Sequence, residues 1–523
     1  MGGQIPFVRE TMTNEKRNPN AIDLLLIYPP WPAAKGRARL ISTLPPLGVL
    51  SIASNVEHHG YSVEVCDAHA YQLDDNDIRT LLRKHKPRVV GLSVLTSQAL
   101  AAHSIARICK QELPNCTVIA GGVHAEALPV RMLRNSAIDA VVRGDGEDAM
   151  VEILANTHFN DITGLSHRTE DGVVHNPARP VNMNLDEYPM PAYHLVDFDM
   201  YYPGATTYRQ LPAINLMMTR GCPGKCTFCN SAKTTLRTRS PESMVAQIKH
   251  LYDEYGIRQF QFYDDTFTVL KKTCLEFCER LTAENLNVSW IGFIRGDCFS
   301  DKIAAAMKKA GCHQVLVGVE TGNPDIANRI GKPIDHKKYK KAVEIAHRHG
   351  IEVRASFVIG SLGETWDTMN DSLKMALNMD FDFVQLFIST PYPGTAMYKE
   401  AAERGWLTHE SWDAYGQARV LVNQPQIDSE TIYRFEKHFN RKFYMRRKFA
   451  KRMLKRSTNP RQFRDYALAV PYLLMGMRSD PTGSKWDCWE GLNEDDFLDV
   501  ALAEPTIDTL THTIRDTGLP NNT

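Results

Sequence analysis

Short runs of aliphatic and β-branched residues alternate with amphipathic segments along most of this chain, and this alternation limits the folds open to it. The first series of runs covers 22–30, 62–67, 88–95, 117–122 and 139–144. Helical patterns separate them, at 47–58, 75–85, 97–112 and 126–135. Strands and helices that alternate at this spacing form βαβ units. We therefore predict an α/β domain over 21–150 with a doubly wound parallel sheet, whose ligand binds beyond the carboxyl ends of the strands.

A second alternating series begins at Ile214. Its six apolar runs start at positions 214, 259, 288, 314, 352 and 383. Six such units predict a partial (βα)6 barrel over 206–400, with its chemistry at the carboxyl ends of the strands. We expect residues 1–20 to be disordered, 151–205 to form a linker and 401–523 to be mostly helical.

Cys222, Cys226 and Cys229 follow the first strand of the second series, in the segment TRGCPGKCTFCN. Their spacing in a glycine-containing loop allows three thiolates to converge on one iron–sulfur cluster, and a four-iron cluster held by three thiolates leaves one iron open. A zinc site is the alternative, but it needs a fourth Cys or His at similar spacing, and none follows Cys229 nearby. We expect Cys274 and Cys278, which lie four apart on a predicted helix, to pack rather than to bind metal.

The cysteine motif, with Phe228 directly before its third cysteine, resembles that of the radical S-adenosylmethionine (SAM) superfamily. Later strand ends agree in order, in QFYDDTF, VGVET, SFVIGSLGET and TPYPGT. The resemblance implies a [4Fe-4S] cluster on the three cysteines, whose open iron takes the amino and carboxylate groups of SAM. It also implies SAM contacts at strand ends, namely at Phe228, Asp264, Asp265, Arg295, Glu320, Ser356 and Gly360.

Residues 22–150 resemble the cobalamin-binding domain that precedes the barrel in B12-dependent members of that superfamily. The resemblance implies cobalamin contacts at Leu44, Pro46, Gly48, Asp67, Ser93, Ser97, Gly121, Gly122, His124, Gly144 and Glu147. The first strand lacks the D-x-H-x-x-G motif that supplies a histidine to cobalt, and Asp67-Ala-His69 follows the second strand without the glycine. We expect a strand-end turn there and no histidine on cobalt. The alternative is the same sheet without cobalamin, because a fold alone does not establish a ligand.

Together the two resemblances imply a cobalamin-dependent radical SAM enzyme, with carbon methylation through a 5′-deoxyadenosyl radical and methylcobalamin as the leading hypothesis. Oxidative cyclisation like that of the anaerobic magnesium-protoporphyrin ester cyclase, or carbon–carbon bond formation on lipids, remains the alternative. A tRNA methylthiotransferase fits less well, because Cys66, Cys109 and Cys116 lie in strand or helix contexts and the C-terminus looks helical. A B12-carrying sensor or electron-transfer module would not need the barrel.

Charge and hydropathy limit the classes of binding partner that we expect for this chain. Lys+Arg and Asp+Glu number 61 each, so no net charge favours nucleic acid. The N-terminus lacks a signal-peptide pattern and no run of about 18 apolar residues is present, which favours a cytoplasmic location. The basic segment 434–456, followed by the apolar run 466–477, predicts a solvated helix or a contact with anionic lipid. We expect a small-molecule or lipid-like substrate and a reductant such as flavodoxin or ferredoxin.

Overall fold

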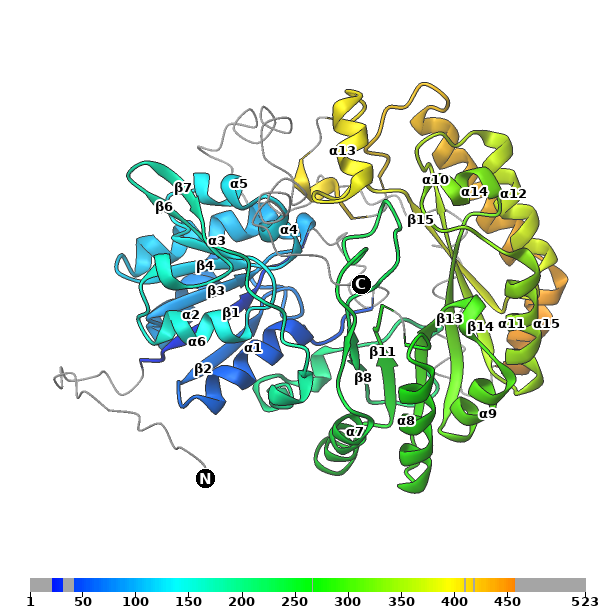
Figure 1. Cartoon of the computed structure of the whole chain (residues 1–523), viewed down its shortest axis with the longest axis horizontal. Helices are drawn as coiled ribbons and strands as arrows, with labels where there is room; N and C mark the ends of the chain where they lie inside the picture. Colours follow the sequence, from blue (N-terminus) through cyan, green and yellow to red (C-terminus); the bar gives the residue numbers. More distant parts are fainter. Residues whose placement is uncertain (1–20, 32–41, 266, 409–410, 417–418, 457–523) are drawn as a thin grey trace, which may run out of the picture.

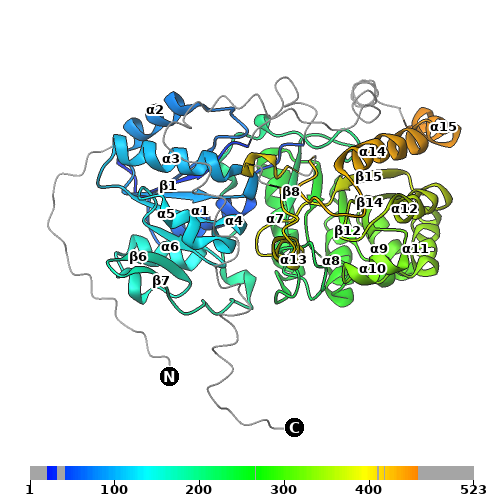
Figure 2. The ribbon, with the colours of Figure 1, turned by 90° about the horizontal axis from the view of Figure 1, so that it is seen from above.

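The computed structural model describes residues 21–31, 42–265, 267–408, 411–416 and 419–456. Two lobes, each built on one sheet, lie side by side in both views (Figure 1, Figure 2). The predicted disorder of residues 1–20 and the apolar run 466–477 fall outside the described residues. Within the described part of the chain, no helix is long and apolar enough to cross a membrane.

The first lobe contains a seven-stranded sheet with the order β2-β1-β3-β4-β5-β6-β7. The first five strands of that order are parallel and β6 and β7 are antiparallel. The strands are β1 (Leu24–Tyr28), β2 (Val63–Asp67), β3 (Val89–Ser93), β4 (Thr117–Gly121), β5 (Ala140–Val142), β6 (Leu165–Thr169) and β7 (Gly172–His175). The predicted doubly wound parallel sheet is confirmed. The prediction of a linker over 151–205 is wrong for β6 and β7, which form an edge hairpin of the sheet. Polar residues alternate in these two strands, as is typical of an exposed edge, and this makes their sequence resemble that of a loop.

Helices cover both faces of this sheet. They are α1 (Leu47–His58), α2 (Asp75–His85), α3 (Ala99–Glu112), α4 (Val123–Ala127), α5 (Pro129–Arg134) and α6 (Glu147–Leu154). Apolar residues of α1 and α6 pack against one face, and those of α2 and α3 belong to the cluster on the other. Since α6 crosses position 150, the predicted boundary at that position cuts through a helix.

The second lobe contains six strands in the order β15-β14-β13-β12-β11-β8, all parallel. They are β8 (Ala213–Leu216), β11 (Gln259–Phe262), β12 (Ser289–Ile294), β13 (Cys312–Glu320), β14 (Glu352–Ile359) and β15 (Phe383–Ile388). The crossover helices are α7 (Pro241–Tyr255), α8 (Lys271–Ala283), α9 (Asp301–Lys309), α10 (Pro324–Arg329), α11 (His336–Arg348) and α12 (Trp366–Asn378), and α13 (Ala396–Glu403) follows the last strand. The sheet curls without β8 pairing to β15 within the described residues, so the predicted partial barrel is confirmed.

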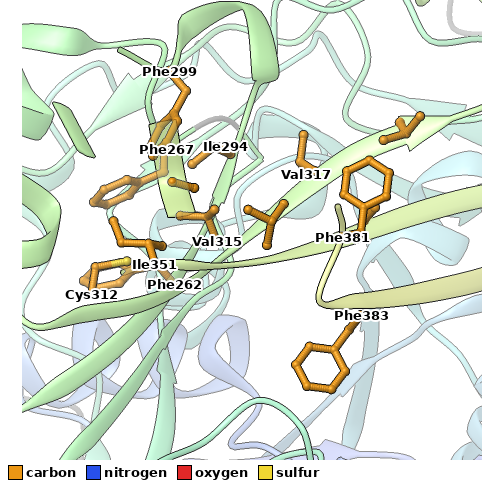
Figure 3. Packing of buried hydrophobic residues seen from close by; sticks show 14 of the residues in the cluster. Phe262, Phe267, Ile294, Phe299, Cys312, Val315, Val317, Ile351, Phe381 and Phe383 are labelled. Carbon is orange, nitrogen blue, oxygen red and sulfur yellow. The ribbon is translucent and has the colours of Figure 1, made fainter. Parts of the chain in front are cut away.

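Aromatic side chains fill the space between the barrel strands and helices (Figure 3). Phe262 contacts the rings of Phe267, Phe277 and Trp290 at centroid distances of 5.0, 5.3 and 5.4 Å. Edge-to-face contacts of this kind add to the free energy of burial. Cys274 and Cys278 are both buried in this core, which confirms that they pack within it.

The C-terminal region closes over both lobes. Helices α14 (Ser429–Tyr444) and α15 (Arg447–Arg456) follow an irregular stretch, so the helical prediction holds from Ser429 to Arg456. Phe435, Phe439 and Phe443 recur every four residues on α14 and are fully buried. The short turn Trp412–Ala414 belongs to the apolar cluster of the first lobe, so this region joins the two lobes.

Candidate functional site

The three motif cysteines lie in a loop that begins and ends in a two-residue antiparallel ladder. Strands β9 (Thr219–Arg220) and β10 (Arg237–Thr238) pair at its base. Gly221 opens the loop with a φ of +89°, and a Cβ there would collide with the carbonyl oxygen of Thr235. Only glycine fits this position, because both the backbone conformation and the space exclude a side chain.

Short contacts bring the cysteines together. A Cβ on Gly224 would lie 3.2 Å from the Cys222 Sγ and 4.0 Å from the Cys226 Sγ, so both sulfurs face the same glycine. The Cys229 N–H donates to the Cys226 carbonyl at 3.3 Å, which places the third cysteine one turn further on. All three are partly exposed, whereas Cys274, Cys278 and the other described cysteines apart from Cys298 are buried.

The donor set fits a cluster better than a single ion. Within the described residues, no three His, Cys, Asp or Glu side chains gather closely enough to hold one metal ion. A [4Fe-4S] cluster does not require that, because each thiolate binds a different iron. Burial raises the pKa of the Cys226 and Cys229 thiols, whereas the Lys332 ammonium group lowers that of Cys226 and a backbone hydrogen bond with Ser231 lowers that of Cys229. Bound iron would add further positive charge that favours the thiolate forms.

Glu320, at the end of β13, forms an ion pair with Lys332 beside the cysteine loop. It has a φ of +66°, and the β13–β14 register shifts between Gly318 and Glu320. Its carboxylate pairs with the Lys332 Nζ at 2.7 Å and accepts a hydrogen bond from the Ser356 Oγ at 3.4 Å. A left-handed conformation outside glycine is uncommon and costs energy, so the contacts around Glu320 must hold it in place.

Lys332 and the glycine beneath it were not identified from the sequence. Burial lowers the pKa of Lys332, but Glu320, Tyr339 and Cys226 together raise it above its usual value, so the lysine stays charged. A Cβ on Gly318 would lie 2.5 Å from the Lys332 Nζ, so a side chain there would displace the ion pair. No local motif marks this lysine, because it lies 12 residues from Glu320, in the loop between α10 and α11.

Other residues predicted to contact SAM have different surroundings. Asp264 is 1% exposed and accepts from the backbone N–H groups of Met218 and Thr219, so it braces the turn between β8 and β9. Both oxygens of Asp264 face the backbone, and its contact with the SAM amino group stays a prediction. Burial raises the pKa of the neighbouring Asp265, while the Ser231 hydroxyl and the Gly221 N–H lower it, so Asp265 lies against the cysteine loop.

Three further candidates lie around the same end of the barrel. Arg295 forms a two-pronged ion pair with Asp297, with N–O distances of 3.1 and 3.0 Å. Phe228 packs against a small apolar cluster that includes Leu362 and Met397. Gly360 has a φ of +77° and its carbonyl accepts from the Gln424 side chain.

The first lobe has a cavity of about 230 Å³ at the carboxyl ends of its strands. Its lining is mostly apolar or glycine, and Gly91, Gly121 and Gly122 contribute no side chains to it. Whole small-molecule sites measure about 300–1,000 Å³, so this cavity has room for only a part of a larger cofactor. A cobalamin nucleotide tail meets that description.

Six of the eleven residues predicted to contact cobalamin line this cavity, and five do not. It is lined by Gly48, Ser93, Gly121, Gly122, Gly144 and Glu147. Leu44, Pro46, Asp67, Ser97 and His124 do not line it. Asp67 instead accepts from the Ala70 N–H and the Tyr201 hydroxyl, which forms the expected strand-end turn. His124 is buried against Trp412 with ring centroids 5.0 Å apart.

Residues of the barrel lobe complete the cavity wall. Met217, Arg220, Arg239 and Gln247 reach it from the second lobe. The Arg220 Nη2 lies 2.6 Å from the Glu147 carboxylate, and Arg237 pairs with Asp145. Sequence reasoning missed these arginines, because their partners lie 73 and 92 residues away.

Two family models match this chain. The model described as the Radical SAM superfamily matches residues 216–376. The model described as the B12 binding domain matches residues 37–154. The first span holds the cysteine loop and most of the barrel, and the second holds most of the strands and helices around the cavity.

Similar proteins cover most of both lobes. An uncharacterized methyltransferase, PH0819, of Pyrococcus horikoshii is 34% identical over 433 residues, which is 81% of this chain and 93% of that protein. The anaerobic magnesium-protoporphyrin IX monomethyl ester cyclase of Rubrivivax gelatinosus is 26% identical, over 82% of this chain and 78% of its own.

Among solved structures, the radical SAM methyltransferase TsrM from Kitasatospora setae, with cobalamin and a [4Fe-4S] cluster bound, superposes with a TM-score of 0.62. The match covers 73% of this chain and 78% of TsrM at 19% identity. At that identity the structural similarity establishes only the fold, in which an α/β sheet domain with a cavity is followed by a partial barrel.

Proposed function

The chain belongs to the radical SAM enzymes that carry a B12-binding domain, and from this premise we propose that it methylates an unactivated carbon of its substrate. Its cofactors are a [4Fe-4S] cluster, SAM and cobalamin. When bound, the cluster and SAM supply a 5′-deoxyadenosyl radical that removes a hydrogen atom, and cobalamin supplies a methyl group. The relationship to PH0819 supports methyl transfer over other outcomes.

The chain's own residues position these groups. Cys222, Cys226 and Cys229 would hold the cluster and leave one iron for SAM. Glu320, Ser356 and their neighbours would surround SAM, since they lie at the ends of adjacent strands beside the cysteine loop. The other residues assigned to SAM are Phe228, Asp264, Asp265, Arg295 and Gly360.

The assignment of cobalamin depends on the cavity of the first lobe. Its glycine-lined floor would take the nucleotide tail, with Gly48, Ser93, Gly121, Gly122, Gly144 and Glu147 around it. The single observation that carries the proposal is that one cavity wall is shared: Met217 and Arg220, which lead into the cysteine loop, line it together with Glu147. A shared wall keeps both cofactor sites close to one substrate.

Anaerobic reconstitution tests this function. The protein would be loaded with iron, sulfide and hydroxocobalamin, reduced strongly, and given SAM with a methyl group that carries a heavy isotope. We expect both S-adenosylhomocysteine and 5′-deoxyadenosine, and a labelled gain of one CH2 in a product formed from a metabolite or lipid extract. Formation of 5′-deoxyadenosine without any S-adenosylhomocysteine would contradict methylation.

Oxidative cyclisation is the second candidate, and the similarity to the Rubrivivax gelatinosus cyclase favours it. The same experiment separates the two, because a cyclase product would lose hydrogen or gain oxygen and carry no label. Carbon–carbon bond formation on a lipid would join two substrate masses instead.

We also propose a small-molecule or lipid-like substrate, a reductant such as flavodoxin or ferredoxin, and a cytoplasmic location. A reducing compartment suits a site built from three thiolates. The reductant is required by the chemistry, since SAM cleavage consumes an electron.

A contact with anionic membrane surfaces is proposed for α14. Arg434, Lys437, Arg441 and Lys442 are exposed along one side of this helix, opposite its buried phenylalanines. Each cation near an anionic surface contributes about 1 kcal/mol. We expect the protein to float with anionic vesicles at low salt and not with zwitterionic ones.

A charge reversal at Lys437, Arg441 and Lys442 should abolish this binding. The same reversal at the exposed Lys337, Lys340 and Lys341 of α11 is the control and should leave it intact. Equal loss in both triple variants would mean that net charge, rather than α14, governs the contact.

A further inference from the structure

We propose that Asp145 and Glu147 of the first lobe, with Arg220 and Arg237 at the base of the cysteine loop, are positioning residues that couple cobalamin binding to the order of the cluster loop. The inference rests on the two cofactors of the family and does not depend on which reaction follows. It goes beyond the assignment of either site, because it states that each site stabilises the other.

One carboxylate holds both ends of the loop. Asp145 lies 3.5 Å from the Arg220 Nη1 and also pairs with the Arg237 guanidinium. Arg220 and Arg237 are opposite each other in the β9–β10 ladder. Since Arg220 lies two residues before Cys222, the position of Asp145 is transmitted through very few bonds to the first cluster ligand.

A second carboxylate extends the contact into the cavity wall. Glu147 is 2% exposed, and its Oε1 accepts from Arg220 at 2.6 Å and from the Ser51 hydroxyl at 2.7 Å. The Arg220 Nη2 also donates to the Ser51 Oγ at 3.1 Å. The three side chains thus form a closed triangle between α1, α6 and the loop base.

Two carboxylates and two guanidinium groups make up this network, so each charge in it depends on an opposite charge of the network. The side chains of Arg237 and Glu147 are 8% and 3% exposed. Burial favours the neutral form of Asp145, but the two arginines together lower its pKa below the usual range. Removal of one member would leave a buried charge without its partner, which favours separation of the remaining groups.

The same short segment faces the cofactor. Gly144, Asp145, Gly146 and Glu147 are consecutive and all line the cavity. Gly144 has a φ of +85° and Gly146 also lacks a side chain, so the segment's conformation depends on what packs against it. A cofactor tail that fills the cavity would therefore restrict this segment, and the ion pairs would pass that restriction to the loop.

Reciprocity gives the test. If cobalamin favours the ordered loop, a cluster that orders the loop must increase cobalamin affinity by the same factor. We would measure the Kd of hydroxocobalamin by anaerobic equilibrium dialysis, for cluster-free and for reconstituted full-length protein. The wild type should bind at least about fivefold more tightly with the cluster present, within the range usual for coupled sites.

Arg220→Gln and Asp145→Asn should reduce this ratio to below about twofold while the cluster is still incorporated. Glu152→Gln is the matched control, because Glu152 lies on the same helix and pairs with Arg179 at 2.6 Å, away from the barrel. It should keep the wild-type ratio. If Arg220→Gln fails to fold, Arg220→Lys replaces it. Lysine retains the charge but not the forked geometry of arginine, so this variant should give a ratio between those of the wild type and Asp145→Asn.

Iron loss to a chelator gives a second readout. Hydroxocobalamin should slow it in the wild type and in Glu152→Gln, and should have no effect in Asp145→Asn. A wild-type affinity ratio near one, or an unchanged ratio in both network variants, would overturn the proposal. These measurements use neither SAM nor substrate, so a failure of the proposed methylation would leave them standing.

Discussion

The two lobes build their sites in opposite ways. The first lobe makes a cavity by omitting side chains, with glycines along its strand ends and apolar residues around them. The barrel lobe makes its site by placing charged and sulfur groups in contact, as in Glu320, Lys332 and the cysteine loop. The first site is therefore sensitive to added atoms and the second to removed ones.

The largest effect is expected at the cluster. Cys226→Ala removes one of three thiolates, and the variant should lose its iron and form no 5′-deoxyadenosine above background. Iron content and product analysis after anaerobic reconstitution check this. Cys298→Ala is the control, since Cys298 is also partly exposed but lies outside the loop. Equal iron loss in both would mean that general thiol chemistry is responsible.

Removal of the barrel's partly buried ammonium group should come next. The Lys332 side chain is 22% exposed, so Lys332→Met, which removes the ion-pair partner of Glu320, should lower the free energy of unfolding by about 2 kcal/mol, between the values for exposed and buried pairs. Urea unfolding measures this change. A second change, Glu320→Gln, should recover most of the loss in the double variant. No recovery would show that the lysine acts through packing alone.

An added side chain should affect the first lobe instead. Gly121→Leu would reduce hydroxocobalamin affinity by about tenfold or more, or about 1.4 kcal/mol, because the leucine occupies the cavity. The fold should tolerate it, since a Cβ there meets its nearest neighbour at 3.9 Å. Gly416→Leu, where a Cβ meets nothing within 4 Å, should bind normally. Unchanged affinity in Gly121→Leu would place the tail elsewhere.

The smallest effect is expected in how steeply the free energy of unfolding changes with pH. Burial raises the pKa of Glu364 in the barrel to about 8. A carboxyl whose pKa is raised on folding stabilises the protein at low pH, and this contribution is lost as pH rises toward 8. Between pH 5 and 7 the loss should be about 1 kcal/mol per pH unit. In unfolding experiments, Glu364→Gln should flatten this slope, and parallel slopes would mean that Glu364 does not titrate there.

Local patterns were enough to predict the parallel strands of both sheets, but not the edge hairpin β6–β7 or every side-chain direction. The two alternating series predicted both sheets, because strand and helix periods are written into neighbouring residues. Asp264 ends its strand as predicted, yet its carboxylate faces the backbone of β8 and β9. Which way a strand-end side chain points depends on groups that only the packed sheet brings near.

The sequence by itself determined the cysteine loop, the glycine-rich strand ends and the two-lobed plan, since each depends on residues close together in the chain. Only the tertiary structure decided that Asp145 and Glu147 meet Arg220 and Arg237, and that Lys332 lies beneath Glu320. The physical reason is distance along the chain. Ion pairs between residues 73 to 92 positions apart leave no periodic signal, and they form only when packing removes the intervening water.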